Sequence, residues 1–174
     1  MKFATGNNNK LMEVRSILGD EIESISIDLL EIQDSNMENV VKHKALEAWN
    51  ILGEEVMIED TSLLIESMND MPGPFIKWFL KALGNEGLVK ATDINNRKAK
   101  AVTYVASFDG HKYNIGYGEI LGVISIEPKG DKGFGWDPIF IPDGGESKTF
   151  AEMDIEEKNK YSMRKIALMD FAKR

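Results

Sequence analysis

The first sixty residues alternate between strand-like and helix-like patterns, and this alternation constrains the fold more than any other feature. Short apolar or alternating runs occupy residues 2–5, 24–29 and 55–60, whereas apolar side chains recur at helical spacing over residues 9–18 and 38–52. An order of strand, helix, strand, helix, strand is typical of an α/β sheet. We therefore predict an α/β fold in which helices cover a sheet.

The rest of the chain adds β-rich segments of antiparallel character. Two long β-rich runs flank the sequence Asp-Gly-His-Lys, which predicts a hairpin. A turn rich in Pro and Gly precedes two short predicted helices, and a Gly-rich stretch precedes a short strand and a last helix. The predicted helices cover residues 75–83, 86–93 and about 155–172, and the predicted strands cover residues 98–108, 113–128 and 138–142. The prediction is thus a mixed β-sheet with flanking helices, in a single domain over residues 1–174.

The composition excludes several classes of function. A formal charge of −8 argues against a surface that binds duplex nucleic acid, which needs a basic stripe. The absence of cysteine excludes disulfides, thiolate catalysis and sulfur-ligated metals, and the two histidines do not form the HExxH motif of zinc hydrolases. The sequence shows no signal region and no stretch that is apolar over the length of a membrane span. We therefore expect a cytoplasmic protein with no nucleic-acid or membrane partner.

The segment Ala-Thr-Gly-Asn-Asn-Asn-Lys at residues 4–10 connects a predicted strand to a predicted helix. Gly and Asn tolerate positive φ, so several backbone N–H groups could converge on an anion at the helix N-terminus. Lys10 would add a full positive charge there. The spacing is that of neither a Walker A loop nor a GxGxxG motif, and the alternative is a capped turn with a solvated lysine.

Carboxylates stand where predicted strands end. Glu59 and Asp60 close the run 55–60, and Glu31 follows the run 24–29. Such positions in an α/β sheet often face a ligand, and hard cations prefer carboxylate oxygens together with water and phosphate. Because strand residues alternate sides, we do not expect Glu59 and Asp60 to point at one site. Asp60 is therefore the candidate to hold Mg²⁺ or orient water, Glu31 could join it, and the alternative is acids on the polar rim of a sheet.

Two predicted helices carry basic residues of interest. Lys44 borders the apolar face of the helix at 38–52 and could bind phosphate, although such a lysine usually extends to water. Lys158, Ser162 and Arg164 lie near one another at the start of the last helix, where Lys158 and Ser162 are four residues apart and would share one face. The alternative for this second group is a solvated charged face.

Residues 133–137, Gly-Phe-Gly-Trp-Asp, place two aromatic side chains around a glycine. Glycine lets the backbone approach a ligand, and stacking of a base on an aromatic ring is worth about 1–3 kcal/mol. Asp137 could accept a hydrogen bond from a purine ring N–H. The alternative is a hydrophobic turn that closes one end of the core.

Taken together and in this order, these segments resemble the inosine triphosphate pyrophosphatase family. The matching motifs are TGNNNKLMEV, EDTSL, PGPFIKWFL and GFGWDPIFIPDG, followed by KTFAEM, EEKN and a Ser-x-Arg-x-x-Ala-Leu pattern, and the resemblance covers about residues 2–171. It implies a mixed α/β fold with an elongated sheet, two lobes around a central nucleotide cleft, a homodimer and a requirement for Mg²⁺. It also implies hydrolysis of the deaminated purine nucleoside triphosphates ITP, dITP and XTP to the monophosphate and pyrophosphate, which cleanses the nucleotide pool.

The resemblance also implies roles for individual residues. The substrate-binding residues would be Thr5, Gly6, Asn7, Lys10, Lys44, Phe134, Gly135, Trp136, Asp137, Lys158, Ser162 and Arg164. Lys10, Lys44 and Asp60 would form the catalytic group. Glu31 matches the metal-binding glutamate, and Asp60 matches the acid that activates the attacking water or holds the metal.

One position departs from the family pattern. Met163 stands in the middle of the family's Ser-His-Arg triplet, and a methionine cannot hydrogen-bond the 6-oxo group of a purine. Either Arg164 and backbone N–H groups suffice for base recognition, or selectivity against adenine is weaker. The sequence does not separate metal ligand from general base among Glu31, Glu59 and Asp60. Two other functions stay open, a non-catalytic nucleotide-binding module and a pyrophosphatase for other modified nucleoside triphosphates, such as modified pyrimidines.

Overall fold

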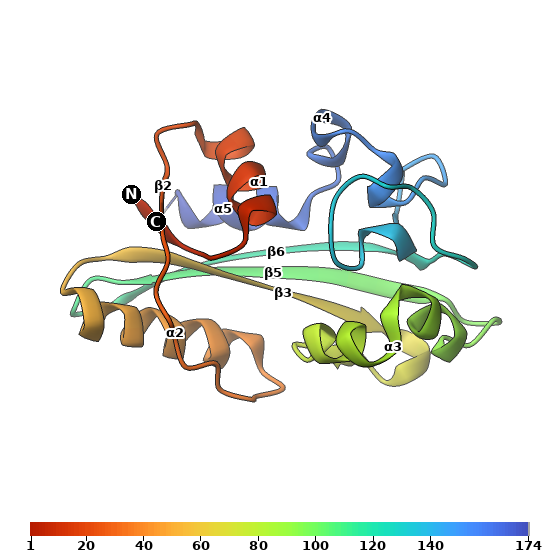
Figure 1. Cartoon of the computed structure of the whole chain (residues 1–174), viewed down its shortest axis with the longest axis horizontal. Coiled ribbons are helices and arrows are strands. Elements are labelled where there is room, and N and C mark those ends of the chain that lie inside the picture. The colour runs from red at the N-terminus through yellow and green to blue at the C-terminus, as the bar shows by residue number, and fades with distance from the viewer. Residues whose placement is uncertain (174) are drawn as a thin grey trace. The chain divides into compact units, whose positions relative to one another are not determined.

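The computed structural model describes residues 1–173, which form a seven-stranded mixed sheet with flanking helices (Figure 1). The strands are β1 (Lys2–Ala4), β2 (Glu23–Ile25), β3 (Val56–Ile65), β4 (Met71–Gly73), β5 (Lys98–Phe108), β6 (Tyr113–Ile124) and β7 (Phe140–Pro142). They follow the order β2-β1-β3-β5-β6-β7, and β4 pairs with β3. β1 runs parallel to β2 and β3, whereas β4 is antiparallel to β3 and β7 to β6. The predicted α/β class with a mixed sheet is confirmed.

Helices of two kinds accompany the sheet. The α-helices are α1 (Asn8–Leu18), α2 (Met37–Leu52), α3 (Ile76–Ala91), α4 (Ile155–Lys158) and α5 (Met163–Phe171). The 3₁₀ helices are η1 (Glu66–Met68), η2 (Asp137–Ile139) and η3 (Phe150–Glu152). Within the described residues, no helix has both the length and the apolar character needed to cross a membrane.

The chain divides into two compact units. The first unit contains residues 1–61, 103–118 and the segment that begins at residue 164, and the second contains residues 62–102 and 119–163. Strands β3, β5 and β6 each contribute residues to both units. Each unit has a hydrophobic core of its own. The predicted site residues therefore fall into two groups, one in each unit.

Helices cover both faces of the sheet in the first unit (Figure 1). Val14 of α1 and Leu168 of α5 pack with Met57 on one face, and Val41 of α2 packs with Ile58 on the other. Successive residues of a strand point to opposite faces, so β3 supplies side chains to both cores. The predicted α/β layering thus follows from apolar residues on both sides of β3.

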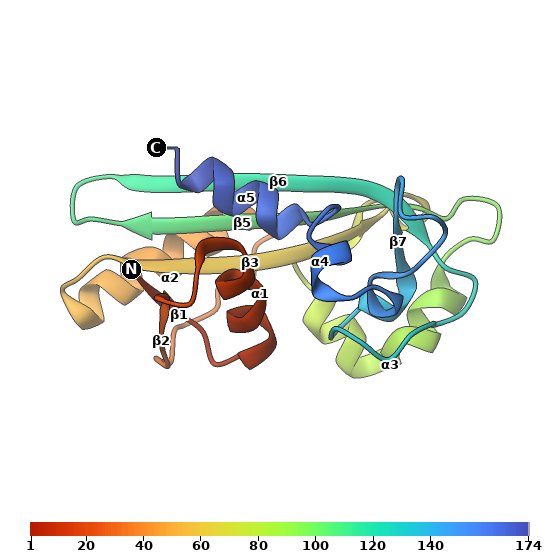
Figure 2. The same cartoon turned by 90° about the horizontal axis from the view of Figure 1, so that it is seen from above.

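Helix α5 approaches β6 closely at Gly116, as the view from above suggests (Figure 2). A Cβ atom added to Gly116 would lie 2.2 Å from the carbonyl oxygen of Ala167. A residue with a side chain could therefore not occupy this position unless α5 moved away. This contact fixes the helix that carries Arg164, one of the predicted site residues.

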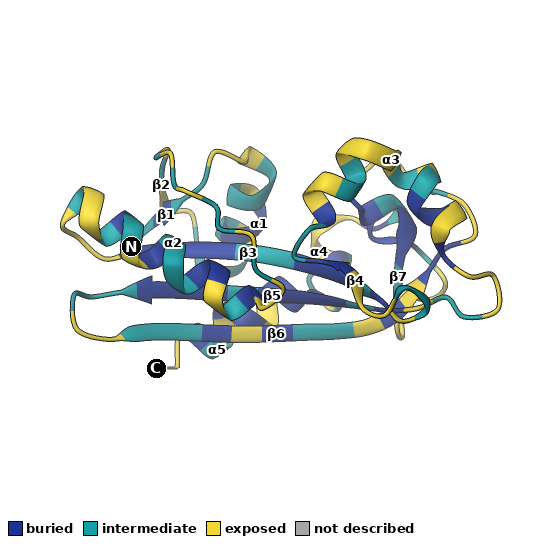
Figure 3. Ribbon diagram, turned by 90° about the horizontal axis from the view of Figure 1, so that it is seen from below, coloured by how far each residue is buried: buried dark blue, intermediate teal, exposed yellow. Residues whose placement is uncertain are grey.

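The core of the second unit is rich in aromatic side chains. The ring centroids of Trp136 and Phe140 are 5.6 Å apart, and those of Phe140 and Phe150 are 5.2 Å apart. Leu63 of β3 and Leu88 of α3 pack against this group. Figure 3 shows that α3 is largely exposed, and its buried residues, Ile76, Leu88 and Val89, lie near its two ends.

The strand predicted at residues 24–29 is shorter than expected, because β2 ends at Ile25. Its partner β1 is only three residues long, so no backbone remains to pair with the residues that follow. Ile27 and Leu29 still pack against the core beside α2. Their alternating pattern therefore reflects burial of a coil rather than a continued strand.

The single helix predicted at residues 155–172 is also wrong, because α4 ends at Lys158 and α5 begins at Met163. The backbone N–H of Lys160 bonds the carbonyl of Glu157, and that of Tyr161 bonds the carbonyl of Lys158. These i→i+3 bonds are tighter than those of an α-helix and close its last turn. By contrast, the two helices predicted at 75–83 and 86–93 are present as the two halves of α3, on either side of a non-helical Gly84.

The strand predicted at residues 55–60 continues to Ile65, so Glu59 and Asp60 lie inside β3 rather than at its end. The extension exists because Leu63, Leu64 and Ile65 pair with β4. Four polar residues, 59–62, precede them in the sequence, and this polar run predicts the end of a strand. The predicted acids thus stand on a continuous strand, which holds them more firmly than a loop would.

Candidate functional site

The turn between β1 and α1 is held by its own side chains. Asn7 Oδ1 accepts hydrogen bonds from the backbone N of Asn9 at 2.9 Å and of Lys10 at 3.2 Å, and Thr5 Oγ1 accepts one from Asn7 N at 3.1 Å. None of these residues, nor the exposed Gly6 between them, has positive φ, because Asn7 caps α1 from an extended conformation. The first turn of α1 holds no acidic residue. Its N-terminus is therefore suited to phosphate oxygens, although the turn does not use the positive φ that we expected.

Lys44 extends from α2 to β3. Its Nζ lies 2.5 Å from Asp60 Oδ2 and 3.0 Å from Glu31 Oε1. With 14% of its side chain exposed, Lys44 does not extend to water. Burial lowers the pKa of Lys44, but the two carboxylates outweigh burial and raise it overall. The ammonium is therefore charged at neutral pH and is held between the two acids.

Lys10 extends from α1 to the same part of β3. Its Nζ lies 3.0 Å from Glu59 Oε2 and 3.7 Å from Asp60 Oδ1, so one ammonium contacts two acids that were not expected to share a site. Burial raises the pKa of Asp60, but Lys10 and Lys44 outweigh burial and lower it overall, which keeps Asp60 ionised at neutral pH. We call Lys10, Glu31, Lys44, Glu59 and Asp60 the carboxylate–lysine cluster.

Arg164 lies inside the first unit, where it contacts two buried carboxylates. Its Nη2 atom lies 3.2 Å from Glu59 Oε1, and its Nη1 atom bonds Glu13 Oε2. The exposed fractions are 1% for Arg164, 6% for Glu13 and 5% for Glu59. Burial lowers the pKa of Arg164 to about 10, and it raises the pKa of Glu59 although Lys10 acts in the opposite direction. The three residues connect α5, α1 and β3, and we call them the Arg164 triad.

Glu13 is the member of this site that the sequence reasoning missed. It lies on α1 beside Val14, which is fully buried, and one turn after Lys10. A carboxylate on the buried face of an amphipathic helix requires a partner, because burial of an unpaired charge is costly. That position was the signal by which the sequence could have revealed a role for Glu13.

Glu31 and Asp60 are the residues that could hold a metal ion, as the sequence suggested. No group of three or more His, Asp or Glu side chains within residues 1–173 is arranged to hold a metal. The pair nevertheless directs one oxygen each at the same Lys44 ammonium. Mg²⁺ is usually bound through one or two carboxylates, with water and phosphate oxygens completing the shell. The donor set therefore fits Mg²⁺ in the presence of a phosphate ligand.

The aromatic loop, residues 133–137, belongs to the second unit. Gly133 and Gly135 have φ of +72° and +63°, a conformation that favours glycine. Asp137 Oδ2 accepts a hydrogen bond from Phe134 N at 2.7 Å, and a Cβ on Gly133 would lie 2.2 Å from the same oxygen. Trp136 is buried in the core, whereas Phe134 is half-buried. The loop thus closes the core, as the alternative supposed, and also presents an accessible ring.

Asp137 and Lys158 form a buried ion pair beside this ring. Lys158 Nζ lies 2.7 Å from Asp137 Oδ2, and 5.3 Å and 5.1 Å from the ring centroids of Phe134 and Phe150. Burial raises the pKa of Asp137, although Lys158 acts in the opposite direction. One oxygen of Asp137 thus holds both the loop backbone and the lysine.

Ser162 and Met163 are buried, with exposed fractions of 4% and 2%. Lys158 and Ser162 do not share a helix face, because α4 ends at Lys158. Met163 belongs to the hydrophobic core that also contains Trp136. A thioether needs no hydrogen-bond partner there, unlike an imidazole, so the residue that departs from the family pattern is well suited to its apolar surroundings.

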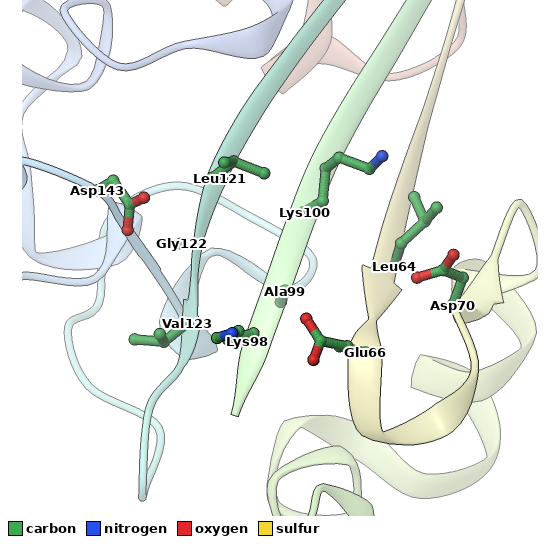
Figure 4. A pocket seen from close by; sticks show the side chains of 10 residues that line it. All are labelled: Leu64, Glu66, Asp70, Lys98, Ala99, Lys100, Leu121, Gly122, Val123 and Asp143. Carbon is green, nitrogen blue, oxygen red and sulfur yellow. The ribbon is translucent and has the colours of Figure 1, made fainter. Parts of the chain in front are cut away.

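A pocket with a volume of about 550 Å³ lies elsewhere in the second unit (Figure 4). Its lining residues are Leu64, Glu66, Asp70, Lys98, Ala99, Lys100, Leu121, Gly122, Val123 and Asp143. Leu64 alternates along β3 with Leu63 and Ile65, which are core residues, so the pocket lies on the other face of the sheet. None of the predicted site residues lines it, and it is not part of the candidate site.

The two groups of residues have complementary chemistry. The carboxylate–lysine cluster combines two lysines with three carboxyl groups, which can bind phosphate oxygens and a hard cation and can orient a water molecule. The aromatic loop offers a half-buried ring with a buried ion pair behind it. Within the first unit the cluster can bind phosphates, and within the second unit the ring can stack on a base.

Comparison with known proteins supports the same interpretation. Residues 1–174 match the model of the Ham1 family. A dITP/XTP pyrophosphatase of Methanopyrus kandleri is 41% identical over 98% of this chain and 93% of its own length. An inosine triphosphate pyrophosphatase of Emericella nidulans is 43% identical over 97% of this chain and 92% of its own length. A solved structure of a HAM1 protein from Coxiella burnetii superposes with a TM-score of 0.84 at 29% identity, and covers 99% of this chain and 95% of that protein.

Proposed function

Because the chain belongs to the Ham1 family, we propose that it hydrolyses deaminated purine nucleoside triphosphates, namely ITP, dITP and XTP. The products are the nucleoside monophosphate and pyrophosphate. The observation that carries the proposal is the carboxylate–lysine cluster, in which Lys10 and Lys44 both lie beside Asp60. Other relatives of similar identity are likewise named dITP/XTP pyrophosphatase or inosine triphosphate pyrophosphatase.

The two lysines neutralise the triphosphate. Lys44 exchanges part of its contact with Asp60 and Glu31 for a phosphate oxygen, and Lys10 does the same from the N-terminus of α1. Charge develops on the transferred phosphoryl group in the transition state, so fixed cations lower the barrier more than they strengthen substrate binding. The main role of both lysines is therefore stabilisation of the transition state.

Asp60 orients the attacking water. Its pKa is lowered by Lys10 and Lys44, so it is an anion at neutral pH and can accept a hydrogen bond from water. Glu59 is the less suitable base, because its side chain is fully buried and pairs with Arg164 and Lys10, whereas that of Asp60 is 17% exposed. This geometry favours Asp60 over Glu59 as the general base, a choice that the sequence alone did not make.

Glu31 and Asp60 would hold Mg²⁺ when the triphosphate is bound. Their oxygens converge on the Lys44 ammonium, which shows that this position already accommodates positive charge. A bound Mg²⁺ supplies charge neutralisation for the phosphates and for the departing pyrophosphate.

The aromatic loop binds the base. The Phe134 ring is accessible for stacking, and Asp137 and Lys158 lie behind it as a charged pair. Ser162 and Arg164, which the resemblance assigns to the base, are both buried. Arg164 pairs with Glu13 and Glu59, so its guanidinium connects α5 to α1 and β3.

We also propose that the enzyme is a homodimer and acts in the cytoplasm, as the family resemblance implies. Light scattering coupled to size-exclusion chromatography would test the first point, because a dimer would have twice the mass of the 19.5 kDa chain. A mass of one chain at micromolar concentration would contradict it.

The decisive experiment is pyrophosphate release in the presence of Mg²⁺, with ITP, dITP and XTP compared with ATP and GTP. Rapid release from the first three and little from the last two would support the proposal. Tight binding of ITP without turnover would favour a nucleotide-binding module, and release only from modified pyrimidine triphosphates would favour another specificity. The Asp60→Asn variant is the control for contaminating activity, since its fold should persist while its turnover is lost.

A further inference from the structure

Asn85 of α3 holds the aromatic loop by a hydrogen bond to its backbone. The Nδ2 atom of Asn85 donates to the carbonyl oxygen of Gly135 at 2.9 Å. Gly135 lies between the buried Trp136 and the half-buried Phe134. The bond thus holds Gly135, which separates the buried Trp136 ring from the accessible Phe134 ring.

The loop needs such a restraint because two of its residues are glycines. Gly133 and Gly135 both have positive φ, and glycine moves between conformations at little cost. Asp137 restrains the Phe134 side of the loop by accepting from its backbone N–H, and Trp136 is fixed by burial. The carbonyl of Gly135 lies between these two restraints, and Asn85 is the residue that binds it.

The position of Asn85 follows from a break in α3. Gly84 has φ of 65° and ψ of −179°, which interrupts the helix immediately before Asn85. A residue with a side chain would be strained at that φ. The other amide atom of Asn85, Oδ1, is buried and makes no hydrogen bond within residues 1–173. An amide in the opposite orientation would place this oxygen against the Gly135 carbonyl, so the donor orientation is the favourable one.

We propose that Asn85 is a positioning residue for base recognition. By fixing the Gly135 carbonyl it holds the Phe134 ring beside Lys158, and so determines how tightly the purine base is bound. This inference rests on the proposed function for its effect on substrate, whereas its effect on the loop stands without it. It concerns a side chain on α3 that belongs to neither the carboxylate–lysine cluster nor the aromatic loop.

The test is the Asn85→Asp variant, which keeps the shape of the side chain but replaces the donor by an oxygen that repels the carbonyl. We expect KM for ITP to rise about three- to tenfold with kcat within about twofold, which corresponds to loss of one hydrogen bond. The inhibition constant of inorganic tripolyphosphate, which carries no base, should not change. Glu86→Gln, at the adjacent exposed position of α3, is the matched control and should leave KM unchanged.

A double-mutant cycle separates positioning from general damage. In a Phe134→Ala background, Asn85→Asp should raise KM no further, because the ring that Asn85 positions is absent. An additive rise in the double variant would overturn the proposal, as would an unchanged KM in the single variant.

A measurement that needs no turnover separates failure of this inference from failure of the proposed function. The N–H of Asp137 bonds the carbonyl of Phe134, so its hydrogen exchange reports the order of the loop. Asn85→Asp should accelerate this exchange at least severalfold, while Glu86→Gln should not. If exchange accelerates in the variant but the wild type does not hydrolyse ITP, the loop-positioning role stands and the proposed function is wrong. If exchange is unaltered, the positioning role is wrong.

Discussion

Lys44 Nζ lies 2.5 Å from Asp60 Oδ2, so a lysine of α2 is held against a carboxylate in the middle of β3. The same ammonium lies 3.0 Å from Glu31 in the coil that follows β2. A single side chain thus connects α2, β3 and the coil after β2, three segments that are close in the sequence. Removal of its charge tests both the stability and the chemistry of the cluster.

We expect Lys44→Met to lower kcat/KM for ITP by about 100-fold or more, because a fixed cation that stabilises the transition state is lost. The free energy of unfolding should fall by about 1–3 kcal/mol, since Asp60 and Glu31 lose a buried partner. Lys42→Met on the same helix is the control, because Lys42 is more exposed, pairs with Glu38 in the adjacent turn and lies over the Tyr113 ring, away from the cluster. Equal losses in both variants would contradict the assignment.

The pH dependence of stability should reveal the lowered pKa of Asp60. A carboxyl whose pKa is lower in the folded than in the unfolded state stabilises the fold above its ordinary value of 3.8, and this contribution is lost as pH falls through the folded value. The stability difference between the wild type and Asp60→Asn should therefore be constant between about pH 5 and 8 and shrink below about pH 4. Urea unfolding at a series of pH values measures it, with the exposed Asp143→Asn as control. A difference that grows toward acid pH would refute this sign.

Arg164→Met should be strongly destabilising, because it leaves Glu13 and Glu59 buried without their shared partner. Removing one member of a buried ionic group typically costs about 3–5 kcal/mol. The loss should be smaller at pH 5 than at pH 8, since burial raises the pKa of Glu59 and protonation removes its unpaired charge. Chemical denaturation at both pH values measures it, and Lys165→Met at the adjacent exposed position is the control. A loss below 1 kcal/mol would show that the triad contributes little to the fold.

Phe134→Ala should raise KM for ITP by roughly tenfold, because stacking on a base is worth about 1–3 kcal/mol. Stability should change little, since the ring is only half-buried. Steady-state kinetics with ITP measure the effect, and Trp78→Ala, which removes an exposed aromatic ring from α3, is the control. An unchanged KM would eliminate the stacking role.

Much of the fold could be predicted from the sequence, because the spacing of apolar residues shows which side of a helix or strand is buried. The alternation around Met57 and Ile58 correctly placed β3 between two helical layers. The same pattern misled at Ile27 and Leu29, which are partly buried in a coil because β1 offers them no further backbone to pair with. Side-chain periodicity carries no information about the length of a partner strand, and this is the reason for the error.

The candidate site was predictable where charge stands out from its local pattern. Lys44 beside an apolar helix face and Asp60 after an apolar run were both predicted as site residues, and the structure places them in contact. Glu13 was missed although its place on the buried face of α1 calls for a partner, because that partner, Arg164, is 151 residues away. No local pattern marks Asn85, whose role depends on a contact with Gly135, 50 residues away. Contacts at such separations follow from tertiary packing, which a single sequence does not display.

Met163 provides the last test, because it stands where the family resemblance leads one to expect histidine. Its side chain is 2% exposed and packs in the apolar core with Trp136 and Phe150. We expect Met163→His to lower the free energy of unfolding by about 1–3 kcal/mol, since an imidazole would be buried there without a hydrogen-bond partner. The ratio of kcat/KM for ITP to that for ATP should not rise, because the residue faces the core. Met163→Leu, which conserves volume, should cost less than about 1.5 kcal/mol and serves as the control. A histidine variant that keeps its stability and gains more than tenfold selectivity would instead place this side chain against the base.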